Sequence, residues 1–156
     1  MAIRNSAKAI LINKGQILVN RCQDADTGET YFDLPGGGQH PLETMENAVM
    51  REVLEETGYE INIIRFAALA EEISLNKNPW QQSPDYAHRI HHIFLAELSK
   101  ENPIHPSERD FQQKECIWLP LNEIQRLVFR PRLLNRNLDA ILASPCPVYL
   151  GSSFEE

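Results

Sequence analysis

The sequence has no apolar run that approaches the roughly 18 residues of a membrane-spanning helix. Near its start the apolar stretch is only Ala9 to Ile12. Such a stretch is too short for the core of a signal peptide. The sequence therefore predicts neither a membrane span nor a secretion signal, and we expect a cytoplasmic protein.

Cysteine is scarce and irregularly placed. The three cysteines, Cys22, Cys116 and Cys146, are far apart and show neither a CxxC motif nor Cys/His ligand spacing. This pattern argues against a disulfide framework and against a structural zinc site. We interpret all three as reduced thiols that contribute to packing.

An excess of basic residues is also absent. The formal net charge of −7 argues against a protein that binds nucleic acid non-specifically, because such binding needs a basic surface. An acidic protein can still bind a phosphate ligand if a metal ion supplies the positive charge. With 156 residues, the chain is long enough for one compact domain, which we predict over residues 1–156.

Helix and strand patterns mix along the chain. A hairpin around Gly15 joins two short apolar runs, and helical spacing of apolar residues extends from Thr44 to Thr57, with Gly58 as the C-terminal cap. Further strands are predicted at 31–34, 61–70 (extending toward 75), 89–98 and 115–119, loops at 76–85 and around Pro103 and Pro106, and helices at 121–128 and 132–143. The order indicates an α+β or layered α/β/α domain with a mixed sheet.

Three acids occupy one face of the predicted helix. Glu52, Glu55 and Glu56 stand at i, i+3 and i+4, so they project together within about 6 Å of helix rise. Their repulsion, and the helix dipole near Gly58, make this arrangement unfavourable. Arg51 can neutralise only part of the charge, whereas Mg²⁺ prefers carboxylates together with phosphate oxygens. On these grounds a metal site and a solvated acidic face stay equally open.

The neighbouring residues favour the metal site. Gly36, Gly37 and Gly38 allow close approach of the backbone to a metal or phosphate. From Gly37 to Tyr59 the spacing resembles the Nudix box, G-x5-E-x7-R-E-U-x-E-E-x-G-U, where U is a bulky apolar residue. Only Tyr59 departs from it, at a position usually aliphatic, and we expect this to affect packing only. The segments 34–37 and 118–121 also look like the family's lead-in and last strand.

The resemblance implies a Nudix-type α/β/α sandwich and a set of site residues. Glu52, Glu55 and Glu56, with the carbonyl of Gly36, match the family's ligands for Mg²⁺ or Mn²⁺. Gly37 and Gly38 are expected to approach the substrate phosphates. The remaining matched positions are expected to be structural supports, namely Glu43 paired with Arg51, and Gly58.

The general base is less defined. In some relatives it is the glutamate after the box arginine, here Glu52, and in others it lies on a distant loop. Glu97 is our additional candidate for metal binding or for the base, its alternative being a surface acid at a strand end. Weaker candidates are Glu71, Glu72, Glu108 and Glu115. Arg21 stands where several relatives carry a phosphate-binding arginine, and its alternative is an ordinary surface residue.

Some aromatic and histidine residues have a functional and a structural interpretation. Tyr31, Phe32, Trp80 and Tyr86 could stack on a nucleobase, although packing is the more common role of such residues. His88, His91 and His92 lie in or next to an apolar strand. We interpret them as polar strand positions, because Mg²⁺ prefers oxygen ligands.

The resemblance implies Mg²⁺-dependent hydrolysis of a phosphoanhydride in a nucleoside diphosphate linked to another group. Nucleoside triphosphates, nucleotide sugars and ADP-ribose-type molecules all stay open as substrates. Two rival hypotheses are a Nudix-like module that binds a nucleotide without cleaving it, and a scaffold with an incidental acidic helix. Family members are often dimers, so a homodimer is a further expectation.

Overall fold

The structure is a computed structural model that describes residues 3–75, 87–107 and 112–155. Its strands are β1 (Arg4–Asn13), β2 (Gln16–Gln23), β3 (Thr30–Asp33), β4 (Gly36–Gly38), β5 (Ile61–Ser74), β6 (His88–Leu98), β7 (Gln113–Pro120), β8 (Phe129–Arg130) and β9 (Val148–Glu155). Its helices are α1 (Met45–Thr57), α3 (Arg132–Ala143) and the short 3₁₀ helix η2 (Leu121–Arg126). No helix in the described ranges is long and apolar enough to cross a membrane.

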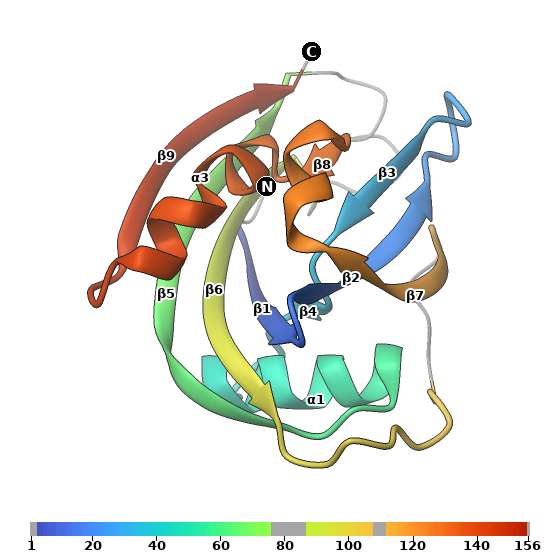
Figure 1. Ribbon diagram of the computed structural model, residues 1–156. Helices are drawn as coiled ribbons and strands as arrows, with labels where there is room; N and C mark the ends of the chain where they lie inside the picture. The colour runs from blue at the N-terminus through green and yellow to red at the C-terminus, as the bar shows by residue number, and fades with distance from the viewer. Residues whose placement is uncertain (1–2, 76–86, 108–111, 156) are drawn as a thin grey trace.

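The described residues form one nine-stranded sheet in the order β8-β3-β2-β1-β6-β5-β9, with β4 beside β1 and β7 beside β2. Pairing is mixed: β6 runs parallel to β1 and antiparallel to β5, and β9 runs parallel to β5. Strand β6 therefore lies between two neighbours, as its apolar faces predict. The sheet is strongly curved (Figure 1), and the predicted α+β fold with a mixed sheet is confirmed.

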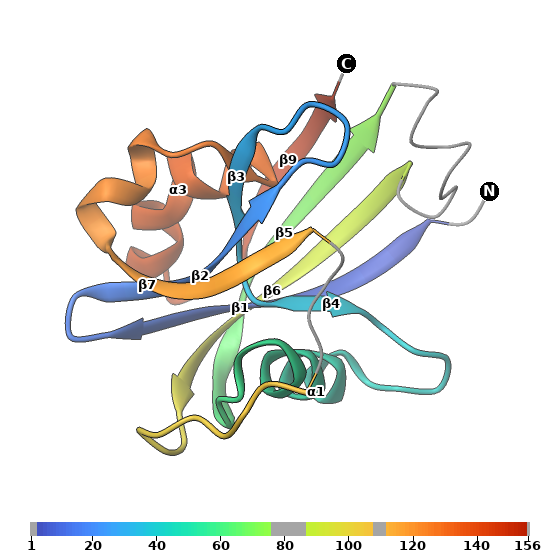
Figure 2. The ribbon, with the colours of Figure 1, turned by 90° about the vertical axis from the view of Figure 1, so that its right-hand side faces the viewer.

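Alternating residues of β1 bury two separate cores. Ala7, Ala9 and Leu11 belong to the cluster that includes Val49 and Val53 of α1. Ile10 belongs to the other cluster, which includes α3 side chains. Because successive side chains of a strand point to opposite faces, the two helices cover opposite faces of the sheet. Figure 2 shows α1 below the strands and α3 above them, so the layered α/β/α prediction is confirmed.

Local signals define α1 at both ends. At its start, the Thr44 hydroxyl accepts a hydrogen bond from the backbone N–H of Asn47 at 3.2 Å. At its end, Gly58 adopts a left-handed conformation with φ of 76°, and its N–H donates to the Leu54 carbonyl at 2.9 Å. The predicted helix and its glycine cap are confirmed.

Other predictions from the sequence need correction. The glycines 36–38 were not predicted as a strand, but they form strand β4 paired with β1. The predicted helix 121–128 is a 3₁₀ helix that ends at Arg126. Strands β8 and β9 were not predicted, because their pairing with β3 and β5 is non-local. The predicted loop 76–85 lies outside the described residues.

The three cysteines form no disulfide, as predicted, but they differ in burial. Cys22 is buried and Cys116 is partly buried, which agrees with packing thiols. Cys146 is exposed, so the packing interpretation is wrong for this residue. It lies in the turn between α3 and β9, where no core is available to cover it.

We expect Gly58→Ala to destabilise the fold more than Gly15→Ala does. Both glycines have φ of 76°, so both substitutions carry the left-handed penalty of roughly 1–2 kcal/mol. A Cβ on Gly58 would also collide with the Ile104 carbonyl oxygen, whereas one on Gly15 would meet open space. Urea denaturation should give a Gly58→Ala loss at least about 1 kcal/mol larger. Equal losses would contradict the close packing of residue 104 on the helix end.

Candidate active site

Arg51 of α1 joins the loop before the helix to the helix itself. Its guanidinium donates to both carboxylate oxygens of Glu43, at 2.8 and 2.9 Å, and to the Gly38 carbonyl at 3.0 Å. This paired arrangement holds the pKa of Glu43 down at about 2, chiefly through the Arg51 hydrogen bonds. The structure thus brings together the two residues expected to pair.

The same guanidinium also contacts two of the predicted metal ligands. Its Nη1 donates to Glu52 at 2.8 Å and to Glu55 at 3.0 Å. The side chains of Glu52 and Glu55 are 17% and 29% exposed, so solvent screens this interaction only in part. Two carboxylates therefore already converge on one cationic nitrogen.

The glycine strand β4 lies directly against these acids. A Cβ on Gly37 would overlap the carboxylate of Glu52, and a Cβ on Gly36 would overlap the Ala7 carbonyl. A side chain at position 36 would push the β1 backbone away, whereas one at position 37 would displace the flexible end of Glu52. Strand β4 is thus the element that brings backbone close to the Glu52 carboxylate.

Glu56 occupies a different environment from Glu52 and Glu55. Its side chain is buried, and its Oε2 accepts hydrogen bonds from the Gly36 N–H and the Asn20 amide, both at 2.9 Å. Burial raises the pKa of Glu56 to about 7, although the nearby Lys8 ammonium opposes this shift. The third predicted ligand therefore faces β2 and β4 instead of Arg51.

Lys8 on β1 is a buried cation that contacts the predicted carbonyl ligand. Its ammonium donates to the Gly36 carbonyl at 2.7 Å, to the Leu34 carbonyl at 3.1 Å and to Asp33 at 2.7 Å. Lys8 and Asn20 were missed from the sequence. The available signal was a polar residue within or at the end of an apolar strand run, since both are buried together with the apolar residues beside them.

The predicted ligands are carboxylate and carbonyl oxygens, which are the ligand types that a hard divalent cation prefers. Among the described residues, no three His, Cys, Asp or Glu side chains already form a cluster that could hold a metal. However, Glu52 and Glu55 share one cation in the form of Arg51, and carboxylates are the oxygen ligands that Mg²⁺ prefers. These two residues are thus the ones best arranged to exchange the guanidinium for a metal ion. Glu56 and the Gly36 carbonyl hold other hydrogen-bond partners.

Glu97 does not belong to the group that Arg51 joins. Its neighbours Ala96 and Leu98 pack in the cluster beneath α1, so alternation along β6 directs Glu97 to the opposite face, where it is exposed. Its assignment as base or ligand stays a prediction that this position does not support.

The other candidates are dispersed over the sheet. Arg21 pairs with Glu115 at 2.6 Å, and each side chain is about half exposed, at 45% and 47%. Glu71 contacts His88 and Ser152, and the buried Glu72 contacts Arg89 and His91. None of these contacts involves the α1 acids. Glu108 lies outside the described residues.

The aromatic and histidine candidates have structural contacts. Tyr31 is buried, donates to Gln112 and lies under the Arg130 guanidinium at 4.0 Å. Phe32 packs against the core on the α3 side. His91 is buried and hydrogen-bonded to Ser6 at 2.8 Å, and His92 lies beside Phe66. Trp80 and Tyr86 lie outside the described residues.

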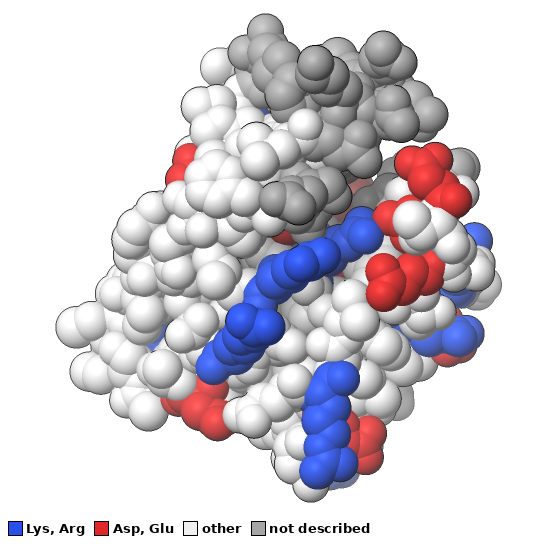
Figure 3. All heavy atoms as spheres, turned by 90° about the horizontal axis from the view of Figure 1, so that it is seen from above, with Lys and Arg blue, Asp and Glu red and all other residues white. Residues whose placement is uncertain are grey.

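Charge is distributed unevenly over the surface. Figure 3 views the end of the molecule opposite α1, where Lys and Arg side chains form a band and groups of Asp and Glu side chains lie toward the edges of the face. Exposed arginines of α3, Arg132 and Arg136, lie one helical turn apart. The acid-bearing helix α1 lies at the other end of the molecule (Figure 1).

A glycine strand held against an acid-bearing helix, within an α/β/α sandwich, is the arrangement that the box implies. A family model described as the NUDIX domain matches residues 2–138. The chain therefore belongs to the NUDIX family, and the predicted resemblance is confirmed.

The chain is also similar to particular relatives. It is 39% identical over 94 residues to a protein of Bacillus subtilis (strain 168) that is provisionally named as an 8-oxo-dGTP diphosphatase. That match covers 60% of this chain and 52% of the relative, so the chain spans about half the length of the curated relative.

Solved structures agree with the fold. A NUDIX hydrolase from Nitrosomonas europaea has a TM-score of 0.72 and 17% identity, covering 91% of this chain and 90% of that one. A MutT protein from Methanosarcina mazei Go1 has a TM-score of 0.68 and 22% identity, with coverages of 91% and 96%. An ADP-ribose pyrophosphatase from Streptococcus suis 89-1591 has a TM-score of 0.64 and 16% identity, with coverages of 95% and 99%. At these identities the likeness shows the fold alone.

We expect Glu56→Gln to stabilise the metal-free protein at pH 8 and to have little effect at pH 4.5. Because the folded protein raises the pKa of this carboxyl from 4.5 to about 7, ionising it costs folding free energy. The cost is absent below pH 4.5 and is complete above about pH 7, where it reaches roughly 3 kcal/mol. A glutamine oxygen can accept the same two hydrogen bonds without charge.

Urea denaturation of both proteins in chelator, across this pH range, measures the difference. Glu46→Gln, an exposed change in the first turn of α1, is the matched control and should alter stability by well under 1 kcal/mol. A destabilised Glu56→Gln protein at pH 8 would contradict the burial argument.

Proposed function

We propose that this NUDIX-family protein is a metal-dependent pyrophosphohydrolase that cleaves a phosphoanhydride bond in a nucleotide. The observation that carries the proposal is the convergence of Glu52 and Glu55 on one cationic nitrogen beside strand β4. An arrangement that already concentrates two carboxylates on one positive charge is suited to holding Mg²⁺, with Mn²⁺ as the alternative cofactor. Relatives named as hydrolases of nucleotides support this activity.

Each residue of the site has a distinct task in this proposal. Glu52 and Glu55 would hold the metal, and Glu56 would join them after releasing Asn20. A bound metal neutralises phosphate oxygens and lowers the pKa of a coordinated water. Arg51 would keep the Glu43 and Gly38 contacts that fix the glycine segment against the helix. The approach of substrate phosphates to Gly37 and Gly38 stays a prediction, since the Glu52 carboxylate and the Arg4 guanidinium lie against these two glycines.

The proposal covers several substrate classes and does not assign the general base. Nucleoside triphosphates, nucleotide sugars and ADP-ribose-type molecules share the phosphoanhydride that the site would cleave. The general base is either Glu52 or an acid from another segment. The cytoplasmic location and the homodimer stay predictions from the sequence. A module that binds nucleotide without cleaving it is the rival, since Arg51 occupies the carboxylates of Glu52 and Glu55.

We expect Glu55→Gln to lower kcat/KM for nucleotide hydrolysis by at least about 100-fold, because a neutral amide is a poor metal ligand. Phosphate or pyrophosphate release is measured with purified protein, Mg²⁺ or Mn²⁺, and a nucleotide panel. Glu60→Gln is the control, because Glu60 is an exposed partner of Lys100 just beyond the helix. Unchanged turnover in Glu55→Gln would refute the metal role.

Metal binding is measured separately by thermal unfolding. Saturating Mg²⁺ or Mn²⁺, at 100 times its Kd, should stabilise the wild-type fold by about 2.7 kcal/mol, and Glu55→Gln should lose most of this gain. Nucleotide binding without hydrolysis under any metal would favour the rival module.

A further inference from the structure

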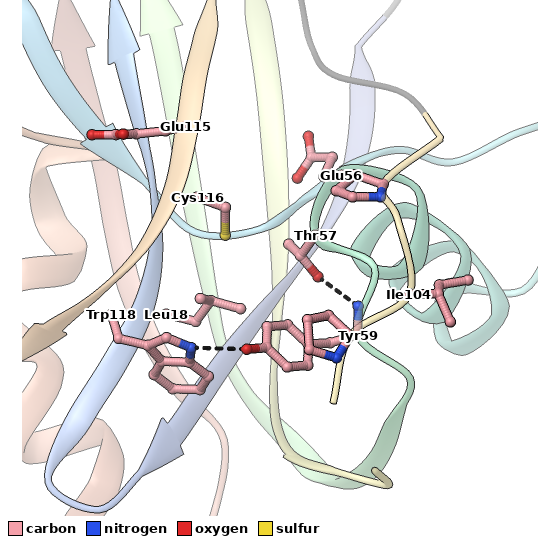
Figure 4. A pocket seen from close by; sticks show the side chains of 10 residues that line it. Leu18, Glu56, Thr57, Tyr59, Ile104, Glu115, Cys116 and Trp118 are labelled. Carbon is pink, nitrogen blue, oxygen red and sulfur yellow. Dashed lines mark hydrogen bonds between the residues drawn. The ribbon is translucent and has the colours of Figure 1, made fainter. Parts of the chain in front are cut away.

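A pocket of about 270 Å³ opens beside the acids, between the C-terminal end of α1, strand β7 and the segment 103–106. Figure 4 shows Glu56 at one end of it and the aromatic pair of Tyr59 and Trp118 at the other. The pocket therefore begins at a predicted metal ligand and extends away from it. Its volume lies just below the range of sites for drug-sized ligands, which suits a single sugar or base ring.

The pocket has walls fixed to the end of the helix. The N–H of Ile104 donates to the Gly58 carbonyl at 2.9 Å, and the N–H of Ser107 donates to the Glu55 carbonyl at 3.1 Å. These bonds satisfy carbonyls that a helix end leaves without intrahelical partners. The segment 103–106 is thus held against α1 as the outer wall of the pocket.

The end of the pocket away from Glu56 is formed by two aromatic side chains that hold each other in a fixed orientation. The indole N–H of Trp118 donates to the Tyr59 hydroxyl at 3.3 Å, and the rings meet edge to face with centroids 5.9 Å apart. Tyr59 is the residue that departs from the Nudix box. The effect of Tyr59 therefore extends beyond packing. An aliphatic side chain at this position would provide neither the ring edge nor the hydroxyl that contact Trp118.

The lining favours an uncharged occupant. Among the residues that the structure describes, its charged members are Glu56 and Glu115, none is Lys or Arg, and much of the rest is apolar, as at Leu18 and Ile104. A terminal phosphate entering this space would lose water without gaining a cation from these described residues, beside two carboxylates. Arg21 is not part of the lining and is paired with Glu115. The phosphates are therefore better held at the Glu56 end.

We infer that this pocket binds the uncharged organic group on the far side of the phosphoanhydride, with Tyr59 and Trp118 as specificity-determining residues. The inference rests on the proposed function, since the pocket continues from the proposed metal site. It favours nucleotides in which a sugar-like ring, and not a terminal phosphate, follows the diphosphate.

The test compares substrates that share a base and differ in the terminal group: ADP-ribose against ATP, and UDP-glucose against UTP. For wild-type protein with Mg²⁺, kcat/KM should be higher for the ring-bearing member of a pair that is turned over. Tyr59→Leu, which restores an aliphatic box residue, and Trp118→Leu should each reduce this ratio by about three- to tenfold through KM. Tyr149→Leu, an exposed aromatic of β9, is the matched control and should leave the ratio unchanged.

A second readout does not need turnover. The chain has two tryptophans, so Trp80→Phe leaves Trp118 as the only indole. ADP-ribose with metal should change the Trp118 fluorescence, whereas ATP should not. If no nucleotide is hydrolysed, the proposed function fails. If nucleotides are hydrolysed but triphosphates are preferred, or both pocket variants keep the wild-type ratio, only the pocket inference is overturned.

Discussion

The close packing of α1 against the glycine strand β4 is the constraint on which the site depends. Gly36 lies against the Ala7 carbonyl, with no room for a side chain, and Gly37 lies against the Glu52 carboxylate, which a side chain there would displace. Apolar contacts of Val49 and Val53 hold the helix on this face of the sheet. Hydrophobic burial thus sets the helix position, and the missing side chains let backbone and carboxylates approach each other.

Bringing these carboxylates close together is electrostatically unfavourable, and two neighbouring cationic side chains reduce that repulsion. Arg51 offsets the repulsion among Glu43, Glu52 and Glu55, while Lys8 lies near the buried Glu56 without restoring its ordinary pKa. A carboxylate that is unfavourable in the metal-free protein becomes favourable when a cation binds. The residues that weaken the empty fold are therefore those expected to give it affinity for metal, which is a common relation between stability and function.

Sequence reasoning predicted what local chemistry determines. Helix α1 was predicted because Thr44, the apolar spacing and Gly58 all act within a few residues. Strand β4 was not, since glycine has little intrinsic preference for strands and only pairing with β1 makes one. Strand β9 was not predicted either, because only its pairing with the distant strand β5 identifies it as a strand. The acids were found by spacing, whereas Lys8 and Asn20 reach Gly36 and Glu56 from distant positions in the chain.

The C-terminal end of α1 connects the acids of the proposed metal site to the wall of the neighbouring pocket. Glu55 and Gly58 offer carbonyls to the segment 103–107, and the next residue, Tyr59, leaves the helix toward Trp118. A movement of this last turn would shift Glu55 and Glu56 and the pocket wall together, because the same backbone carries them. Selectivity for the group beyond the diphosphate and affinity for the metal are then properties of one helical turn.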